Sequence, residues 1–301
     1  MPLRKDIWRV GIVRKPMQDL LKAGSLQGEV VHWLPELPAL HFDADPFAVW
    51  RDGALHLFVE TYDYWRRRGS IDVLTLDENF RVRERRPALN EPWHLSYPFL
   101  IEDGGQIYML PEAFRSGTLT LYRAVEFPTR WEPAARIVLD TIAIDATPVF
   151  HNGLWWLFYT SAESKRAKVA ALHVAFAERL TGPWRVHAHN PVRFDPTSAR
   201  PGGTPLVIDG NIVLPVQDCA ETYGGGLRKL TITKLTPDVF EADASARFMP
   251  PAAGAYAHGL HTLSAAGDLT LIDAKKFEVS AETLASDVDH LFRKALRRFG
   301  G

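Results

Sequence analysis

The sequence predicts an all-β fold, a five-bladed β-propeller with a short N-terminal extension and a C-terminal α-helix. A recurring phrase supports this prediction: a proline, a hydrophobic run, a turn and a second hydrophobic run. Its four prolines, and the glycine that replaces the proline in a fifth copy, are 50 to 57 residues apart. A fixed period near fifty residues is typical of propellers and other repeat arrays. The copies span residues 45–60, 97–112, 147–163, 204–218 and 258–273.

Each copy predicts a β-hairpin, because two apolar or alternating runs flank a turn that contains glycine. Further β-like runs follow the hairpins, such as SIDVLTL at 70–76 and TLTLYRA at 118–124. Each unit therefore holds about four strands, as does the blade of a propeller. A β-sandwich with accidental self-similarity is the alternative, and the regular period disfavours it.

Two segments outside the repeats complete the predicted organisation. In the N-terminal extension, residues 1–40, the run IWRVGIV predicts a strand that joins the last blade, since a ring closed by both ends of the chain leaves no open sheet edge. The propeller itself is expected over 41–279. Over 280–301, Ser280 as N-cap predicts one amphipathic helix, which either docks on the propeller or binds a partner. Its apolar residues at helical spacing are Leu284, Val288, Leu291, Phe292 and Leu296.

Composition limits the class of protein. The 301 residues are 46% hydrophobic and carry a formal net charge of −1, so the basic footprint of a nucleic-acid-binding protein is missing. Cys219 is the single cysteine, which rules out an intramolecular disulfide. With no apolar signal core and no run of membrane-spanning length, we expect a cytoplasmic protein. The C-terminal helix is a candidate for peripheral contact with a membrane or a protein through its basic residues Arg293, Lys294, Arg297 and Arg298.

Propeller geometry predicts where polar residues gather. The first strand of each blade lines the channel and the second returns to the same end, so residues that begin the first strands and end the second strands converge there. Carboxylates, an arginine, histidines and aromatic rings suit a sugar, and two facing carboxyl groups can divide acid and base work at a glycosidic bond. The candidate binding residues are Asp43, Glu60, His94, Ser96, Arg200, Asp218, Tyr223, His258 and His261, and the candidate catalytic carboxyl groups are Asp45, Glu112 and Asp145.

No metal and no cofactor is expected at this site. His258 and His261 are three residues apart at the start of a strand, where side chains at that spacing point to opposite faces. The run YGGGL at 223–227 is a flexible turn, because no Lys-Ser/Thr pair follows it as in a phosphate loop. The aromatic rings expected to serve the sugar are Trp50, Trp65, Trp93, Trp155, Trp156 and Tyr223.

Several motifs resemble those of known five-bladed propellers. FDADPF at 42–47, HLSYPFLIEDGGQIYMLPE at 94–112, IDATPVF at 144–150 and SARPGGTPL at 198–206 are similar to motifs of the glycoside hydrolase family 43 superfamily. More narrowly, the sequence resembles the propeller domain of glucosamine inositolphosphorylceramide transferases and its bacterial relatives. The motifs that carry this resemblance are WRVGIV followed by WLPE, then ADPF, then SYPF, and finally QDC followed by YGGGL. The resemblance extends from Trp8 to about Phe277.

The resemblance implies roles for some of these residues. In the hydrolases the base is the Asp before the first blade's proline, which corresponds to Asp45, and an orienting Asp corresponds, with an offset of two residues, to Asp145. Their general acid is a Glu in the region where this sequence has Arg200 and no Glu. Either another carboxyl group, Glu112 above all, is the acid, or a nucleotide or phosphate leaving group needs none. In the second case Arg200 and the N–H groups of the adjacent glycines would hold the phosphate.

Two functions remain open. One is an enzyme that makes or breaks a glycosidic bond with inversion, by glycosyl transfer or hydrolysis, on a carbohydrate or nucleotide-sugar ligand. The other is a non-catalytic glycan-binding propeller that positions substrate for a partner enzyme. For the enzyme we expect Asp45, Glu112 and Asp145 to face one pocket, with Arg200 and His94 on its wall. Close carboxylates cannot all ionise cheaply, so at least one of the three should have a raised pKa.

Overall fold

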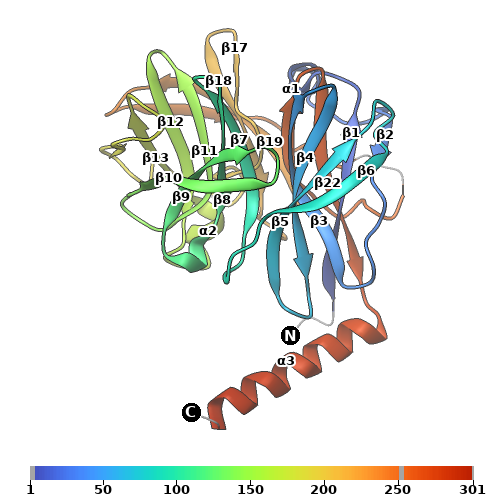
Figure 1. The fold of residues 1–301 in the computed structure, drawn as a ribbon. Helices are drawn as coiled ribbons and strands as arrows, with labels where there is room; N and C mark the ends of the chain where they lie inside the picture. Colours follow the sequence, from blue (N-terminus) through green and yellow to red (C-terminus); the bar gives the residue numbers. More distant parts are fainter. Residues whose placement is uncertain (1–3, 251–253, 300–301) are drawn as a thin grey trace.

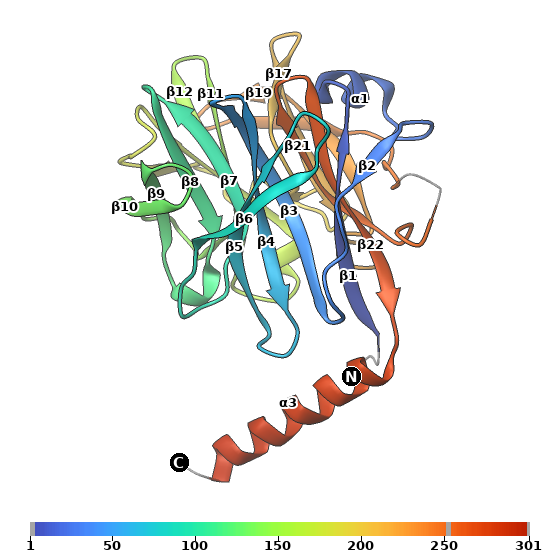
Figure 2. The ribbon, with the colours of Figure 1, turned by 45° about the vertical axis from the view of Figure 1, so that its right-hand side comes forward.

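The computed structural model describes residues 4–250 and 254–299, and for residues 291 and 293–299 it describes the backbone alone. Five antiparallel sheets stand around a central channel as the blades of a propeller (Figures 1 and 2). The inner strands of neighbouring blades contact one another along that channel. The all-β, five-bladed prediction is confirmed, and the sandwich alternative is excluded.

The first two blades are four-stranded meanders in which each strand pairs with the next. Two-residue turns close their inner hairpins, with positive φ at Asp52 and Gly53 in one blade and at Gly104 and Gly105 in the other. This turn geometry matches the twist of the strands, which is why the repeats carry Asp-Gly and Gly-Gly pairs there. The strands are β3 (His41–Arg51), β4 (Ala54–Asp63), β5 (Arg68–Leu76) and β6 (Val82–Leu89), then β7 (Ser96–Asp103), β8 (Gln106–Glu112), β9 (Leu119–Glu126) and β10 (Arg130–Ile137), with a 3-10 turn, η1 (Phe114–Ser116), after β8.

The third and fourth blades are interrupted versions of this meander. Two short strands replace the outermost strand of the third blade, and two replace the inner strand of the fourth. The latter break falls at Gly203, where a Cβ atom would lie 1.8 Å from the carbonyl oxygen of Leu263 in the next blade. Only glycine permits that approach. The elements are β11 (Ala143–His151), β12 (Leu154–Ser161), α2 (Ala167–Ala170), β13 (Ala171–Ala177), β14 (Arg185–Val186) and β15 (Arg193–Phe194), then β16 (Arg200–Pro201), β17 (Leu206–Ile208), β18 (Asn211–Asp218), β19 (Gly226–Leu235) and β20 (Phe240–Ala244).

The fifth blade is built from both ends of the chain. Strand β1 (Lys5–Val13) pairs along its whole length with β22 (Leu269–Glu278). Strands β2 (Val31–Trp33) and β21 (Leu260–Ala266) complete the sheet on either side, and α1 (Met17–Ala23) connects β1 to β2. The strand expected from IWRVGIV therefore covers the edge that the last hairpin would otherwise expose.

Apolar side chains fill the space between neighbouring blades. One cluster joins Phe47 of β3 and Tyr97 of β7 to Leu157 of β12, and the rings of Phe47 and Tyr97 pack edge to face with 4.9 Å between centroids. Buried aromatic rings supply large contact areas with defined geometry. The ends of the channel-lining strands, and the polar side chains on them, are thus positioned by the whole ring.

Helix α3 (Ala281–Phe299) lies at the end of the propeller where the N-terminus is found (Figure 1). Ser280 caps it as predicted: the Ser280 hydroxyl accepts a hydrogen bond from the Thr283 N–H (3.3 Å), and the Thr283 hydroxyl accepts one from the Ser280 N–H (3.0 Å). Among the described residues, no helix combines the length and the apolar character needed to cross a bilayer. Of the helical residues named above, Leu291, Arg293, Lys294, Leu296, Arg297 and Arg298 have side chains outside the described part of the chain.

Candidate active site at the channel mouth

A pocket of about 550 Å³ opens at the α3 end of the channel, and Asp287 of α3 stands on its rim. This volume is within the usual range for small-molecule sites. Its deepest polar groups are buried carboxyl groups, and cationic side chains such as Lys168 lie nearer the mouth. Eight of the twelve predicted site residues line it: Asp45, Glu60, His94, Ser96, Glu112, Arg200, Tyr223 and His261.

Irregular backbone at the start of the inner strands directs side chains into the channel. Asp45, Tyr97 and Asp145 have positive φ angles of 50°, 45° and 49°. Each lies within a break in strand register, on β3, β7 and β11 respectively. Positive φ is unfavourable for residues with a Cβ and concentrates at functional sites, where the surrounding fold enforces it. The repeated prolines of the sequence therefore mark the position of a repeated bulge.

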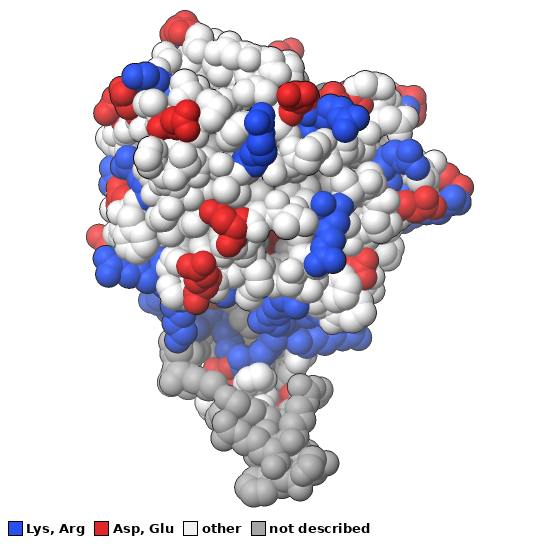
Figure 3. All heavy atoms as spheres, turned by 90° about the vertical axis from the view of Figure 1, so that its left-hand side faces the viewer, with Lys and Arg blue, Asp and Glu red and all other residues white. Residues whose placement is uncertain are grey.

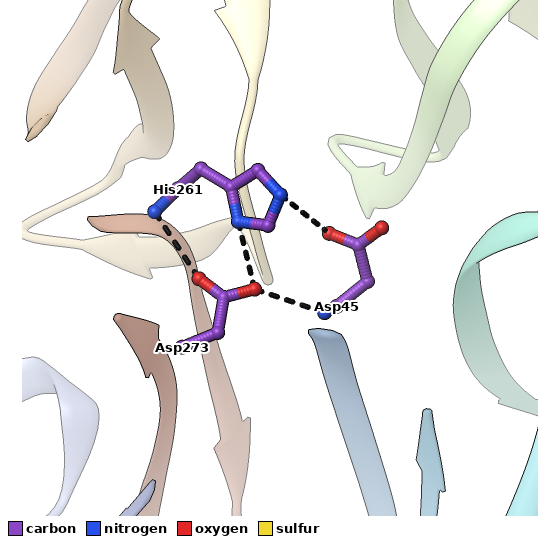
Figure 4. Close-up of side chains that lie close together, drawn as sticks. All are labelled: Asp45, His261 and Asp273. Carbon is purple, nitrogen blue, oxygen red and sulfur yellow. Dashed lines mark hydrogen bonds and ion pairs between the residues drawn. The ribbon is translucent and has the colours of Figure 1, made fainter. Parts of the chain in front are cut away.

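Asp45, His261 and Asp273 form a buried network (Figure 4), in which Asp45 and His261 line the pocket and Asp273 lies behind them. Asp273 Oδ2 accepts a hydrogen bond from the Asp45 N–H (2.9 Å) and lies 2.7 Å from His261 Nδ1. Across the ring, His261 Nε2 lies 3.6 Å from Asp45 Oδ1. The Thr262 hydroxyl donates to Asp45 Oδ1 (2.8 Å), and the Tyr97 N–H donates to Asp45 Oδ2 (3.1 Å). Asp273 thus fixes the imidazole, which in turn faces the Asp45 carboxylate.

Burial and charge together set the protonation of this network. Burial raises the pKa of Asp45 to about 6, although a positive charge on His261 opposes the rise. Burial favours the neutral His261 ring, but the carboxylates of Asp273 and Asp45 outweigh it and raise the pKa of that histidine. A carboxylate with a pKa this close to neutrality is suited to accepting a proton.

Glu112 ends β8, in the blade next to that of Asp45, and also lines the pocket. The Ser96 hydroxyl donates a hydrogen bond to its Oε2 (3.0 Å), and the Phe114 N–H donates one to its Oε1 (2.7 Å). Burial, reinforced by the charge of Asp145, raises the pKa of Glu112 to about 7. Near neutral pH a substantial fraction of Glu112 is therefore protonated and able to donate a proton.

Glu60, on β4, is the third of the predicted carboxyl groups that line the pocket, after Asp45 and Glu112. Burial, together with the charges of Asp45 and Glu112, raises the pKa of Glu60 well above its usual range. Its neighbour His94 accepts a hydrogen bond at Nδ1 from the Gly69 N–H (2.8 Å), so a neutral ring carries its proton on Nε2, which lies 3.7 Å from Glu60 Oε1. Burial, aided by the charge of Arg115, lowers the pKa of His94 to about 4, so the His94 ring is neutral near pH 7.

Asp145 lies behind Arg200 and does not line the pocket. The Arg200 Nε donates to Asp145 Oδ2 (2.7 Å), and the Gln217 side-chain amide donates to the same oxygen (3.0 Å). The Arg200 guanidinium also lies over the Tyr223 ring, 5.0 Å from its centroid. Asp145 is therefore positioned to hold Arg200 in place. The expectation that Asp145 faces the same pocket as Asp45 was wrong, because its carboxylate is directed to Arg200 and Gln217 instead.

The glycines beside Arg200 do not form the expected phosphate nest. The Gly202 N–H donates to the Pro215 carbonyl (2.9 Å), and the Gly203 N–H donates to the Tyr97 hydroxyl (2.8 Å). Both groups are used inside the fold, because the inner strand of the fourth blade packs directly against its neighbours. Any phosphate in the pocket has side-chain cations, and not these N–H groups, as partners.

Three further predicted residues lie outside the pocket. Asp43 accepts two hydrogen bonds from Arg85 (2.7 and 2.9 Å). The bulge after Ala44 turns the side chains of Asp43 and Asp45 in different directions, although the two residues are two positions apart on one strand. Asp218 pairs with Arg228 (2.8 Å) between β18 and β19. His258 is exposed, and its ring packs on Phe277. The sequence predicted the correct ends of the strands for these residues. It did not predict the direction in which their side chains point.

The aromatic lining differs from the expected set, of which Tyr223 alone lines the pocket. The Trp8 ring stacks on the His261 imidazole, with 3.7 Å between centroids and 9° between planes. Tyr62 is two residues after Glu60 on the same strand, so its side chain points to the same side of the sheet. The sequence alone would have allowed Tyr62 to be predicted in the pocket. Trp8 comes from the closing strand, and no repeat marks it. The aromatic side chains in the lining are Trp8, Phe42, Tyr62, Tyr64, Phe114 and Tyr223.

The Asp45–His261–Asp273 network is the one group among the described residues whose side chains could together bind a metal cation. One ligand atom each from Asp45, His261 and Asp273 lies within 4.8 Å of the others. Asp273, however, already accepts hydrogen bonds from the N–H groups of Asp45, His261 and Thr262. A cation bound at Asp273 would compete with these bonds, which hold the strand ends together.

Comparison with known proteins reveals a sequence family. The family described as "Glucosamine inositolphosphorylceramide transferase 1, N-terminal" matches residues 36–259. The proteins named glucosamine inositolphosphorylceramide transferase 1 from Oryza sativa subsp. indica and Arabidopsis thaliana are 37% and 34% identical to this chain, over 67% and 66% of its length. The matched region is 27% and 26% of those relatives, so the chain spans about a quarter of their length.

Solved structures share the fold at low sequence identity. A family 117 glycoside hydrolase from Zobellia galactanivorans superposes with a TM-score of 0.56 at 13% identity, covering 83% of this chain and 90% of that one. The GH43_1 enzyme from Xanthomonas citri complexed with xylose superposes with a TM-score of 0.55 at 14% identity, covering 83% and 91%. At this identity the similarity concerns the architecture alone.

Proposed function

The chain belongs to the family of the N-terminal region of glucosamine inositolphosphorylceramide transferase 1, as its motifs indicated, and we propose that it is a carbohydrate-active enzyme acting on a glycosidic bond with inversion. One observation carries the proposal. The buried carboxyl groups of Asp45, Glu60 and Glu112 line a single pocket, and Asp45 faces a histidine that Asp273 holds. Buried carboxyl groups with separated roles are what acid–base chemistry at an acetal requires.

In this proposal Asp45 is the general base. Its carboxylate accepts the proton of a water or of an acceptor hydroxyl while that oxygen forms the new bond to the anomeric carbon. The glycosidic bond to the leaving group breaks on the opposite face, which inverts the configuration. Its pKa of about 6 leaves Asp45 mostly ionised at neutral pH, as a base must be.

Glu112 is the proposed acid when the leaving group is an alkoxide. With a pKa of about 7 it retains a proton at neutral pH and can deliver it to the departing oxygen. Glu60, whose pKa burial raises well above its usual range, is the second candidate for this role. Hydrolysis of a glycoside and glycosyl transfer to a hydroxyl both fit this arrangement.

A nucleotide-sugar donor is the alternative that needs no acid. Its phosphate leaves as a stable anion, and Arg200 and Lys168 line the pocket to receive the charge. The names of the relatives point in the same direction, toward transfer of glucosamine to an inositolphosphorylceramide acceptor. Because the chain spans a quarter of those relatives, this activity is proposed for the present pocket and not inherited from them.

A non-catalytic, glycan-binding propeller is the second candidate function. It is favoured by the Arg200–Asp145 ion pair (2.7 Å), which occupies the region where the related hydrolases have their acid. In that case the aromatic rings and buried carboxyl groups hold a sugar and no bond changes.

The Asp45→Asn variant distinguishes the two functions. For an enzyme, turnover of nucleotide sugars or aryl glycosides falls by 10²- to 10⁴-fold, roughly the contribution of a general base, while sugar affinity measured by calorimetry changes little. The exposed Asp103→Asn, at the end of β7 next to the hairpin turn of the second blade, is the control and retains full activity. A wild-type protein that binds sugar without turning over any donor establishes the binder and refutes the enzyme.

A further inference from the structure

Helix α3 packs on the propeller in an unusual orientation, with its polar side inward. The Asp287 carboxylate forms ion pairs with Lys5 and with Arg67 (2.7 Å), and the Ser286 hydroxyl donates to the Tyr64 carbonyl (3.4 Å). Asp287 and Ser286 are both buried. A helix of a globular protein normally buries its apolar stripe and exposes its polar face, so α3 must have another use for its apolar side.

The apolar side of α3 is exposed to solvent. Leu284, Val288 and Phe292 follow one another at four-residue spacing and are 51%, 58% and 63% exposed. At this spacing they form one continuous stripe along the helix. Together with Ala281 and Ala285 they line a shallow apolar surface. The predicted docking of this helix therefore occurs, but through its polar face, which leaves the apolar stripe without a partner among the described residues.

The end of the propeller that adjoins α3 is cationic. Figure 3 shows Lys and Arg side chains gathered along this rim. Three loops of the rim, residues 63–68, 113–118 and 162–168, contain seven Lys or Arg residues and two acidic ones, Asp63 and Glu163. Each loop contributes a residue to the pocket, which places all three at its mouth. The exposed cations of these loops are Arg66, Arg115, Lys165 and Arg166.

We propose that this end of the molecule docks on an anionic lipid bilayer, with the apolar stripe of α3 inserted at the interface. An apolar stripe beside a field of Lys and Arg is the pattern of interfacial helices that bind anionic membranes. Trp65, 40% exposed, follows directly on Tyr64, whose carbonyl bonds α3. Tryptophan favours the headgroup level of a bilayer, so the loop supports the same orientation.

A second copy of the chain fits this surface less well than a bilayer does. Pairing of two identical α3 stripes about a twofold axis would bring two cationic rims together, which costs electrostatic energy. An anionic bilayer can bury the apolar stripe of α3 and at the same time attract the cationic side chains of the rim. Docking in this way turns the pocket mouth toward the membrane. The inference uses none of the carboxyl groups proposed for catalysis, Asp45, Glu60 and Glu112, so it stands or falls independently of the proposed chemistry.

Flotation of the full chain with lipid vesicles tests the proposal. The wild-type protein floats with vesicles of phosphatidylcholine containing about 30% phosphatidylserine and not with phosphatidylcholine alone, and added salt releases it. The triple variant Leu284→Gln, Val288→Gln, Phe292→Gln binds the anionic vesicles at least about tenfold more weakly, because three exposed apolar groups are lost. The charge variant Arg66→Glu, Arg115→Glu, Lys165→Glu weakens binding to a similar or greater extent.

Controls separate membrane docking from other occupants of the stripe. Val207→Gln changes an exposed apolar residue on β17, at the opposite end of the molecule (Figure 1), and leaves binding unchanged. Light scattering should find a monomer. The proposal is overturned if the wild type fails to float with anionic vesicles, or if the stripe variant floats as well as the wild type. A dimer that the stripe variant converts to monomer overturns it in favour of a second copy.

Discussion

At the scale of single residues, Asp273 is the least visible part of the site and the one on which the others depend. It accepts hydrogen bonds from three backbone N–H groups and faces His261 Nδ1 at 2.7 Å, yet it does not touch the pocket. We class it as a positioning residue. Its position on the second strand of the fifth hairpin is evident from the repeats, but its inward direction depends on how β21 and β22 pair, which no local pattern encodes.

The variant Asp273→Asn should lower the pKa of His261, because it removes the carboxylate that raises this pKa most. An NMR titration of the His261 ring measures the shift directly. Turnover should fall with a larger change in kcat than in KM, since Asp45 loses its fixed partner. Asp268→Asn, exposed on the turn that joins the same two strands, is the control and should leave both quantities unchanged. An unchanged His261 titration in Asp273→Asn would contradict the assigned role.

Two residues define the expected pH dependence of activity. Turnover needs Asp45 ionised and Glu112 protonated, so it should fall below pH 6 as Asp45 gains a proton and above pH 7 as Glu112 loses one. In Glu112→Gln the alkaline limb of the profile should disappear together with most activity toward glycosides that need an acid. A profile that keeps its alkaline limb in this variant would assign the acid role elsewhere, with Glu60 the first candidate.

The same groups make folding stability depend on pH in a defined direction. Both pKa values are raised in the folded state, so the folded protein holds these protons to higher pH than the unfolded chain does. The contribution of these bound protons to the free energy of unfolding is complete below about pH 4 and is lost as the pH rises toward 7. Glu112→Gln should therefore be more stable than the wild type at pH 8, by up to about 3 kcal/mol in urea unfolding. The exposed Glu102→Gln should show no such gain.

At the scale of elements, the closing strand β1 has the largest expected effect on stability. It pairs with β22 over nine residues and buries Val10, Ile12 and Trp8. Deletion of residues 1–14 should lower the melting temperature of the whole ring, because it exposes the edge of the last hairpin. Ile12→Ala, fully buried, tests the same strand more gently and should cost about 2–4 kcal/mol. A truncated protein with an unchanged melting temperature would refute the role of β1.

Elements were predictable from the sequence to the extent that local rules govern them. Asp-Gly, Gly-Gly and Asn-Gly pairs fix the hairpin turns, and Ser280 fixes the start of α3. The orientation of α3 was not predictable, because its apolar stripe signals burial in most proteins. Ion pairs from Asp287 to Lys5 and Arg67 hold the opposite face instead, and the residues involved are more than 200 positions apart in the sequence.

At the scale of the whole molecule, the repeat period was sufficient to predict the architecture, because five hairpins at a spacing of 50 to 57 residues close one ring. The period also predicted which strand ends meet at the channel mouth. It could not predict which side chains enter the pocket, since that depends on positive φ at Asp45, Tyr97 and Asp145 and on pairing between blades. The cationic rim comes from loops, which lie outside the repeated phrase.

The charge distribution of the pocket predicts the orientation of its ligand. Buried carboxyl groups occupy the bottom, and Lys168 and Arg200 belong to the wall. A nucleotide sugar should therefore bind with its sugar toward Asp45 and its phosphates toward Lys168 and Arg200, and should bind at least about tenfold more tightly than the free sugar. Lys168→Met should remove most of that difference, whereas Lys165→Met, exposed and outside the pocket, should preserve it. Equal calorimetric affinities for nucleotide sugar and free sugar would instead select a glycoside or glycan ligand, for which Glu112 must provide the proton.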